Sequence, residues 1–452
     1  MTSCKVFIPF GAVGFEISKE AFENGLKLHP DIISSDAGST DSGPYYLGTG
    51  TSKYSRNAVK EDMRMILKGA KKLGIPVTIG NCGTCGTDSG VNLMEQICQE
   101  ICQEENFHLK IAKIYTQQDK KVLKEKFLSG KIHPLGNAPK IYETTFNSCS
   151  NIVALAGAEP FIKALKEKAD VILCGRASDT SILAAMPLLK GCDPGIVWHG
   201  AKTAECGSFC TTNPTNGGVF VTFNKDNFII EPTANDSQCT VYSVSAHMLY
   251  ENTDPFILTE PNGKIDVSRA EYKQLDERRV QVFNSKFIKE NQYTMKLEGS
   301  GPVGYQTLSI VGIRDPKILA NLKTWLSDLR KVLENRLNQL AIPQDDYSFK
   351  LKPYGWNAVT EEDNYPKNFT PKEIGLILVV TGKTQEIATL VAKTCNPKLL
   401  HFRAALNEPL PSFAFPFSPA EIEKGRIYEF KLNHIVDVDD PFELVSIKYT
   451  NI

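Results

Sequence analysis

The sequence predicts an α/β protein: a parallel sheet with flanking helices, an antiparallel β insertion, and a small C-terminal α+β domain. Short apolar segments alternate with segments of helical periodicity through the first half, which is typical of parallel βαβ units with right-handed crossovers. Near residue 216 the pattern changes to alternating stretches that indicate antiparallel strands. We therefore expect an α/β domain over 1–345, with its antiparallel portion at about 216–313, and an α+β domain over 346–452.

The first half contains five short segments that we expect to be strands: Lys5–Phe10, Asp31–Asp36, Ile75–Gly80, Leu109–Tyr115 and Asp170–Cys174. Helices are expected between these segments, because their apolar residues recur at helical spacing and capping residues flank them. They are Lys19–Leu28 with Ser18 as N-cap, Val59–Leu73 ended by Gly74 and Pro76, Gly90–Gln103 with Ser89 as N-cap, and two helical stretches before Asp170.

The second half is expected to be more strand-rich. It should contain a hairpin (Gly218–Phe223 and Phe228–Glu231), a helix (Cys239–Tyr250), several antiparallel strands between 264 and 311, and a long helix (Lys317–Leu340) opened by Pro316. Residues 342–372 are rich in charge and proline and are interpreted as a linker. Beyond them we expect a strand (Ile374–Thr381), a helix (Gln385–Thr394) and two late strands (Arg426–Val436 and Leu444–Tyr449).

Composition narrows the class of partner. The 452 residues include 51 Lys+Arg and 52 Asp+Glu, so the net charge is −1, which gives no long-range field for nucleic acid or an anionic membrane. No stretch approaches the ~20 apolar residues that span a bilayer, and the N-terminus lacks a signal-peptide pattern. The 12 cysteines are interpreted as thiols of a cytoplasmic protein. We expect a small anionic partner (a carboxylate, phosphate or acyl-CoA), no nucleic acid and no membrane.

Three polar, glycine-rich loops follow three of the expected strands, at residues 36–44, 80–88 and 175–180. Because ligands of open α/β sheets bind beyond the carboxyl ends of the strands, we expect the loops to meet at one edge. Glycine lets the backbone approach a ligand, hydroxyl and N–H groups suit an anion, and carboxylates suit acid–base chemistry or a hard metal ion. The alternative is that each loop is only a turn followed by a helix N-cap.

The candidate site residues lie mainly in these loops. The fork-shaped guanidinium of Arg176 suits a carboxylate or phosphate. His247 is expected to share a helical face with Ser243, although a lone histidine in such a helix is more often a core residue. The candidate catalytic residues are Asp36, Asp41, Asp179 and His247. The candidate ligand-binding residues are Gly38, Ser39, Thr40, Gly83, Thr84, Asp88, Gly175, Arg176, Ser178 and Glu205.

Other motifs are weaker. The sequence at 11–14 (GAVG) is half of a dinucleotide fingerprint, and 382–384 (GKT) ends like a Walker A motif but lacks its upstream glycine, so we expect a strand end and helix cap there. Cys82 and Cys85 have the spacing of a thiol pair, but no second pair completes a zinc site, so we predict no metal centre. The two thiols would be reactive if a helix N-terminus lowered their pKa. No cofactor is identified by these patterns.

Several segments together resemble the acyclic terpene utilisation (AtuA-like) family, in its shorter bacterial form. They are DAGSTDSGPYYLG at 36–48, GRASD at 175–179, AECG at 204–207, SVSAHMLYE at 243–251, MKLEG at 295–299, GIRDP at 312–316 and FAFPFSP at 413–419. The resemblance covers nearly the whole chain and implies an α/β N-terminal region with a small C-terminal region. Its namesake belongs to gene sets that degrade acyclic terpenes through CoA thioesters, which gives context without a reaction. Cys82, Thr84, Cys85 and Ser89 depart from the family pattern.

The leading hypothesis is a cytosolic catabolic enzyme of lyase, hydratase or hydrolase type, acting on a small carboxylate or its CoA thioester in acyclic terpene or branched carboxylate degradation. Asp36 or Asp41 would be the general base, and Arg176 would hold the anionic end. Two alternatives are a non-catalytic subunit that binds an acyl carrier or partner enzyme, and a nucleotide-binding oxidoreductase. The aromatic residues Phe413, Phe415 and Phe417 indicate a contact surface within the chain or between subunits, and we expect a homo-oligomer.

Overall fold

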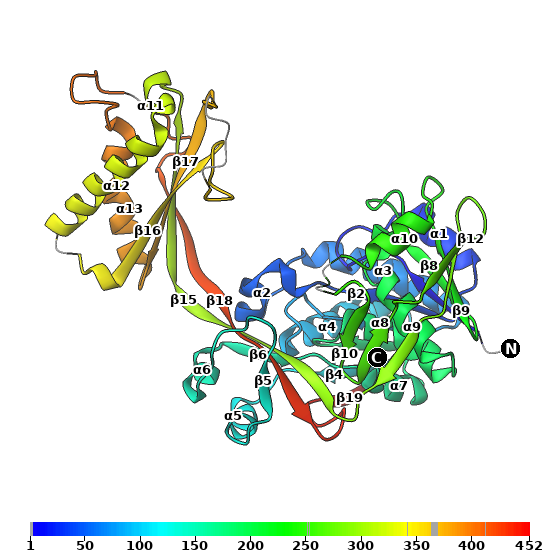
Figure 1. Ribbon diagram of the computed structural model, residues 1–452. Coiled ribbons are helices and arrows are strands. Elements are labelled where there is room, and N and C mark those ends of the chain that lie inside the picture. Colours follow the sequence, from blue (N-terminus) through cyan, green and yellow to red (C-terminus); the bar gives the residue numbers. More distant parts are fainter. Residues whose placement is uncertain (1–2, 251, 253, 341, 363–368, 412) are drawn as a thin grey trace. The chain divides into compact units, whose positions relative to one another are not determined.

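The computed structural model describes residues 3–250, 252, 254–340, 342–362, 369–411 and 413–452, and the side chain of Asp41 lies outside this description. The chain forms two compact units (Figure 1). Unit 1 comprises Met1–Gly301 and Glu429–Ile452, and unit 2 comprises Pro302–Tyr428. The boundary expected at 345/346 falls inside unit 2, and the division into folding domains stays a prediction.

Unit 1 alternates strands and helices in the expected way, and so the predicted α/β class is confirmed. Its helices are α1 (Lys19–Lys27), α2 (Pro44–Thr49), α3 (Arg56–Leu73), α4 (Asp88–Glu105), α5 (Lys120–Leu128), α6 (Glu143–Ser148), α7 (Glu159–Lys166), α8 (Asp179–Leu189), α9 (Pro194–Ala204) and α10 (Val241–His247). Its strands are β1 (Cys4–Ile8), β2 (Ile32–Asp36), β3 (Val77–Gly80), β4 (Lys110–Tyr115), β5 (Ile132–Pro134), β6 (Asn151–Ala154), β7 (Val171–Cys174), β8 (Val219–Phe223), β9 (Asn227–Pro232), β10 (Ile257–Glu260), β11 (Gly263–Asp266), β12 (Glu271–Gln274), β13 (Val280–Phe283), β14 (Lys286–Lys289) and β19 (Ser446–Asn451). Two long strands, β15 (Tyr293–Ile313) and β18 (Glu421–Val438), have residues in both units.

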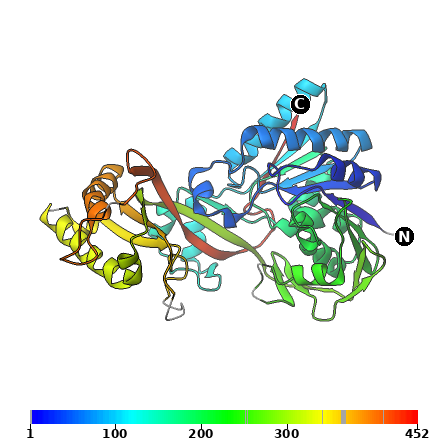
Figure 2. The same cartoon turned by 90° about the horizontal axis from the view of Figure 1, so that it is seen from above.

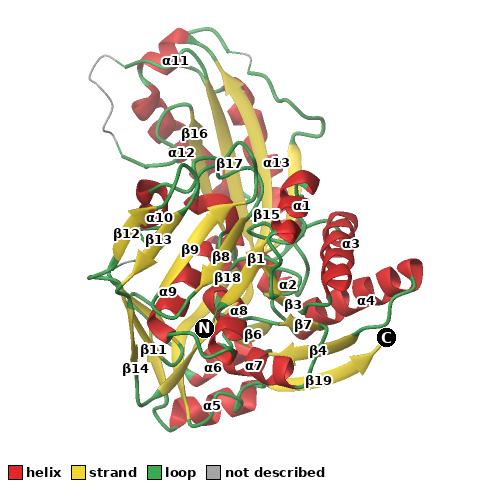
Figure 3. Cartoon of the chain, turned by 90° about the vertical axis from the view of Figure 1, so that its right-hand side faces the viewer, coloured by secondary structure: helices red, strands yellow, loops and turns green. Residues whose placement is uncertain are grey.

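The main sheet of unit 1 has the strand order β12-β13-β9-β8-β1-β2-β3-β7-β4-β19. Its centre is parallel from β1 through β2, β3 and β7 to β4. The antiparallel insertion extends one side through the expected hairpin β8–β9 and then β13 and β12. On the other side β19 pairs antiparallel with β4, where the two lie next to each other in Figure 3. The last strand of the chain thus completes the sheet of unit 1.

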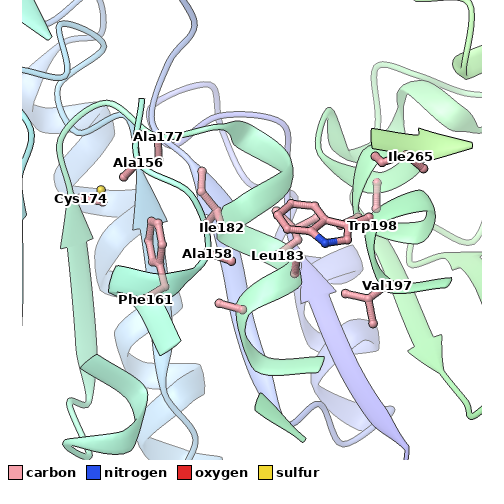
Figure 4. Packing of buried hydrophobic residues seen from close by; sticks show 14 of the residues in the cluster. Ala156, Ala158, Phe161, Cys174, Ala177, Ile182, Leu183, Val197, Trp198 and Ile265 are labelled. Atoms are coloured by element: carbon pink, nitrogen blue, oxygen red, sulfur yellow. The ribbon is translucent and has the colours of Figure 1, made fainter. Parts of the chain in front are cut away.

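Helices cover both faces of the parallel strands (Figure 2). The helices α1, α3 and α4 pack on one face through side chains such as Phe22, Met63 and Ile97. The helices α7 and α8 pack on the other face through Phe161 and Ile182. The helix α9, which carries Trp198, packs beside α8 and on the antiparallel strands β8 and β9, and Figure 4 shows these three side chains. The two faces follow from strand geometry, because successive side chains of a strand point to opposite sides. A parallel sheet covered in this way is buried on both faces, and accordingly every residue of β2, β3 and β7 is buried.

Unit 2 is an α+β unit. It contains the helices α11 (Pro316–Ala320), α12 (Leu322–Gln339) and α13 (Gln385–His401), and the strands β16 (Tyr347–Tyr354) and β17 (Ile374–Gly382), besides its parts of β15 and β18. The strand β17 lies between β16 and β15 and alternates buried with half-buried residues. Figure 1 shows α12 and α13 on one face of these strands, where Leu329, Val391 and Leu378 belong to one hydrophobic cluster.

Several local predictions are corrected. The expected linker at 342–372 contains β16, whose alternating residues pair with β17. The long helix expected at 317–340 is two helices, because Asn321 interrupts it, and α13 continues through Pro397 beyond its expected end. Ser89 is not an N-cap, because α4 begins at Asp88, and its hydroxyl instead donates to the Gly50 carbonyl.

The remaining differences concern the ends of elements and the number of elements between β4 and β7. The helix expected over 239–250 is limited to α10, and α5, β5, α6, β6 and α7 stand where two helical stretches were expected. Ser18 caps α1 as predicted, with its hydroxyl accepting from the Ala21 N–H. Within the described residues, we find no helix whose length and apolar content would let it traverse a bilayer.

Candidate functional site

The three glycine-rich loops meet at one edge of the main sheet. They follow β2, β3 and β7, which are neighbouring parallel strands, so their carboxyl ends point the same way. The chain leaves β3 into α4 on one face and leaves β7 into α8 on the other. Ligands of open α/β sheets bind at such a switch point, because the diverging connections leave a crevice between them. The convergence predicted from the sequence is therefore present.

Asn81, at the start of the second loop, ties all three loops together. Its amide oxygen accepts from the Ala177 N–H at 3.0 Å, so its NH₂ group must point the other way. That group donates to Asp36 Oδ1 at 2.7 Å and to Asp179 Oδ1 at 2.5 Å. Because an amide NH₂ has two hydrogens, one can serve each carboxyl. Asn81 thus fixes the relative position of two carboxyls, one at the end of β2 and the other at the start of α8.

Arg176 forms a second connection among the same loops. Its two terminal nitrogens donate to the carbonyls of Gly38 (3.5 Å) and Thr84 (2.8 Å), and its Nε lies 3.4 Å from Glu298 Oε2. The residue as a whole is only 3 % exposed. The sequence suggested this guanidinium as an anion-binding fork. In the structure most of its nitrogens contact protein groups, and it connects the loops to one another.

The loops border a cavity of about 530 Å³, within the usual range for small-molecule sites. Its polar lining comes from the first and third loops, the N-terminal turn of α8, the end of α9, the β10–β11 turn and β15. The polar and charged lining residues are Ser39, Thr40, Arg176, Ser178, Asp179, Thr180, Lys202, Glu205, Thr259, Glu260, Thr294, Lys296 and Glu298.

Most of the charged lining groups are paired within the cavity. The Ser178 hydroxyl donates to Glu260 Oε2 at 2.6 Å, and the Thr180 hydroxyl donates to Glu205 Oε2 at 2.6 Å. Lys202 forms an ion pair with Glu205, one helical turn away.

Glu298 has three partners of its own. It is 2 % exposed, accepts from the Thr40 hydroxyl at 2.9 Å and pairs with Lys296 at 2.8 Å, besides its contact with Arg176. Burial acts to raise its pKa, but the charges of Arg176 and Lys296 outweigh burial and hold this pKa below its ordinary value. Glu298 is therefore an ionised counter-charge of the cavity wall.

Three other carboxyls, Glu260, Asp36 and Asp179, have pKa values above their ordinary values. Burial raises the pKa of Glu260 to about 7, and burial likewise raises the pKa values of Asp36 and Asp179. Asp179 is raised further by the negative charges of Asp36 and Glu205. The reason is that a carboxylate loses hydration in the interior, so its neutral form is favoured. These groups are able to hold protons near neutral pH, which ordinary carboxyls do not.

The cavity receives only part of the residue set predicted from the sequence. Ser39, Thr40, Arg176, Ser178, Asp179 and Glu205 line it. Asp36 connects to the cavity through Asn81 and Asp179 rather than lining it. Gly38, Gly83, Thr84 and Gly175 shape the loops: Gly38 has a φ of +133°, and a Cβ there would lie 2.6 Å from Thr84 Oγ1. The side chain of Asp41 lies outside the described residues.

Two predicted residues lie elsewhere. Asp88 borders another cavity, of about 370 Å³, with Gln117 and Lys448. His247 is 8 % exposed and stacks on Tyr250, and burial lowers its pKa to about 4. Neither residue lines the cavity at the loops. Ser243 completes the cap of α10 by bonding Thr240.

The other motifs are structural. Cys82 and Cys85 are fully buried and free, and burial raises the pKa of Cys82, which disfavours its reactive thiolate. In the half fingerprint, the Gly14 N–H is bonded to Asp62 at 2.7 Å. Thr384 caps α13 as expected. Within the described ranges, no group of three or more His, Cys, Asp or Glu side chains is placed to hold a metal ion.

Sequence reasoning missed several residues of the site, among them Asn81, Lys202, Glu260, Lys296 and Glu298. Asn81 was within the second loop and was passed over because an asparagine after a strand is common in turns. Lys296 and Glu298 fell in a segment noted only for its family resemblance. Nothing near Glu260 or Lys202 in the sequence marks them, because only the fold brings them beside α8.

Comparison with known proteins identified one family. The family model described as acyclic terpene utilisation family protein AtuA matches residues 35–190 and 219–409. These ranges contain the three loops, Glu260 and Glu298, whereas Lys202 and Glu205 lie between them. No curated protein and no solved structure matches the chain.

Proposed function

This chain belongs to the acyclic terpene utilisation (AtuA) family, which suggests a role in the use of acyclic terpenes, and from that premise we propose that the cavity of unit 1 is an acid–base site for a small carboxylate or its CoA thioester. The observation that supports this most is the gathering of buried carboxyls with raised pKa values at one cavity: Asp179 and Glu260 in its lining and Asp36 next to it. Perturbed carboxyls in a cleft are typical of functional sites.

Asp179 and Glu260 are the proposed proton-transfer groups. Both line the cavity, and each has a hydrogen-bond partner that fixes its position, Asn81 for Asp179 and Ser178 for Glu260. A carboxyl whose pKa lies near 7 exchanges its proton most effectively at neutral pH. Glu260 has such a pKa, and the pKa of Asp179 is raised as well, so that the two groups supply a general acid and a general base for adding or removing water, as the lyase, hydratase or hydrolase types require.

Asp36 is assigned a positioning role, in place of the general-base role that the sequence suggested. It accepts from Asn81 and from the Gly38 N–H at 3.1 Å, and it is 5 % exposed. Its charge also disfavours ionisation of Asp179, because two carboxylates that share one donor repel each other. Asp36 would thereby favour the protonated form of Asp179.

Lys296 is the proposed contact for the anionic end of the ligand. Its side chain is 34 % exposed, whereas the Arg176 side chain is 4 % exposed and bonded to two carbonyls. An ammonium group on a flexible stem can turn from Glu298 toward a bound carboxylate. We assign Arg176 to the support of the loops.

The test is a pair of isosteric substitutions, Asp179→Asn and Glu260→Gln, with Glu277→Gln at an exposed position as the control. Carboxylates and acyl-CoA thioesters are first screened for ligand-induced thermal stabilisation, and any that bind are then assayed for turnover. Turnover should fall by roughly 10² or more in either cavity variant, with ligand-induced stabilisation retained. Binding without turnover in the wild-type protein would instead favour a non-catalytic, ligand-carrying subunit.

A further inference from the structure

One wall of the cavity is apolar. Besides the polar groups, the lining contains Leu135, Leu155, Phe430 and Ile435. Leu135 follows β5, and its N–H donates to the Asn433 carbonyl of β18. Ile435 pairs with His133 of β5, and Phe430 lies on the same strand β18. Three of the four side chains thus come from one pair of neighbouring strands.

These strands are separate from the elements that carry the titrating carboxyls. Asp179 begins α8 after the third loop, and Glu260 ends β10. Leu155, the fourth apolar residue, follows β6, and its N–H donates to the Lys296 carbonyl. The carboxyl-bearing and the large apolar residues of the lining therefore come from different elements.

The four apolar side chains lie outside the hydrophobic core. None of them belongs to any of the three hydrophobic clusters found among the described residues. Leu135 is 39 % exposed, and the other three are half-buried. Single exposed apolar side chains are ordinary, but four that share one cavity wall next to buried carboxyls indicate a surface for an apolar part of a ligand.

We propose that this wall holds a hydrocarbon chain of the ligand, so that the substrate class is a carboxylic acid or thioester with an acyl chain of several carbons, not a small hydrophilic acid. The acyl chain lies against Leu135, Leu155, Phe430 and Ile435, while the carbonyl end reaches Asp179 and Glu260. This inference rests on the proposed function, since it names the ligand of the same cavity.

The expected signature is a dependence of affinity on chain length. Each methylene moved from water to an apolar wall strengthens binding about fourfold, until the wall is filled. A site that recognises only the carboxylate would bind short and long acids equally well.

The experiment measures the affinity of the full-length protein for acetate, butanoate, hexanoate and octanoate, and for the matching CoA thioesters, by calorimetry. The wild-type protein should bind the longer members more tightly. In Leu135→Gln the affinity for octanoate or its thioester should fall about tenfold, with that for the acetate member unchanged. The matched control is Leu128→Gln: Leu128 ends α5, is 69 % exposed and does not line the cavity, so the chain-length dependence should persist.

The failures of the two proposals are distinguishable. If acids of every length bind equally, or if Leu135→Gln and Leu128→Gln have the same effect, the apolar wall is not a ligand surface and this inference is overturned while the acid–base site stands. If neither acids nor thioesters of any length bind, the proposed function fails and this inference with it. Should Leu135→Gln fail to fold, Phe430→Leu tests the same wall by shortening it without adding a polar group.

Discussion

Asn81 is the residue on which the geometry of the proton-transfer site depends. It is fully buried, and all three of its hydrogen bonds go to residues of the three loops or to the carboxyls that they carry. Because the Ala177 N–H holds the amide oxygen, the orientation of the NH₂ group is determined by the backbone. A single side chain thereby sets the separation of Asp36 and Asp179.

Replacing Asn81 by alanine should lower the free energy of unfolding by about 2 kcal/mol, because the buried Ala177 N–H and two carboxyls lose their partner. Urea denaturation measures the change. Asn92→Ala is the control, since Asn92 is exposed and bonds the Tyr115 hydroxyl; its effect should be within about 0.5 kcal/mol. Equal losses in the two variants would argue against the bridging role of Asn81.

Glu260 should make stability depend on pH. Its pKa is raised from 4.5 to about 7 by burial, so the folded protein keeps a proton that the unfolded chain releases. The contribution of Glu260 to the free energy of unfolding should therefore be largest below about pH 4.5 and fall as the pH rises from about 4.5 to about 7, by at most about 1.4 kcal/mol per pH unit. Glu260→Gln keeps the shape and removes the titration.

Urea denaturation at pH 5, 6 and 7 tests this expectation. The slope of stability against pH should be smaller in Glu260→Gln than in the wild-type protein, while Glu277→Gln at an exposed position should keep the wild-type slope. Asp36 and Asp179 contribute in the same direction, because burial raises their pKa values too. A wild-type slope in Glu260→Gln would mean that Glu260 titrates as an ordinary carboxyl.

At the scale of elements, β19 is an edge strand of the main sheet. It pairs with β4 along six residues, from Ser446 opposite Tyr115 to Asn451 opposite Lys110. Partly buried Ile447 packs against the hydrophobic cluster on one face. Without β19, β4 would lose these pairings and become the edge of the sheet, and the apolar surface under Ile447 would be exposed, which favours association between molecules.

Removing residues 446–452 should therefore lower the melting temperature and promote aggregation, as measured by thermal unfolding and light scattering. A matched full-length variant, Lys448→Thr, changes one side chain of β19 but keeps the strand, so it should remain monodisperse and lose far less stability. If the truncated chain melts like the full-length protein, β19 contributes nothing to the sheet edge.

At the scale of the molecule, every residue that lines the cavity belongs to unit 1. Unit 2 has its own hydrophobic cluster, formed by α12, α13, β17 and neighbouring residues. Its two connections to unit 1 are the long strands β15 and β18, which are neighbours in one sheet. The cavity should not need unit 2 for its chemistry.

Replacing residues 302–428 by a short Gly/Ser linker should leave unit 1 able to fold and to bind the same ligands. Cooperative thermal unfolding, with and without ligand, is the measurement. Ending the chain at residue 360 is the contrasting variant. It removes β17, α13, β18 and β19 together, and with them residues of the hydrophobic clusters of both units, so we expect this variant to aggregate. Loss of ligand binding in a well-folded linker variant would show that unit 2 takes part in the site.

Much of the fold was predictable because its signals are local. The strands at 32–36 and 171–174, the N-cap Ser18 and the hairpin at 219–232 each depend on neighbours a few residues away. Errors occurred where tertiary contacts outweigh local pattern. The segment 347–354 looks like a charged linker, but pairing with β17 makes it a strand, as context often does for β propensity.

The sequence by itself determined the α/β class, the family, and the three glycine-rich loops at the ends of their strands, because periodicity, caps and turn residues act over short distances. Only the tertiary structure decided which side chains form the site. Glu260 and Glu298 lie far along the chain from Asp179, and the strand order that places β7 beside β3 cannot be read from their order in sequence. The raised pKa of Glu260 has the same origin, since a carboxyl loses its hydration only when residues from distant segments close around it.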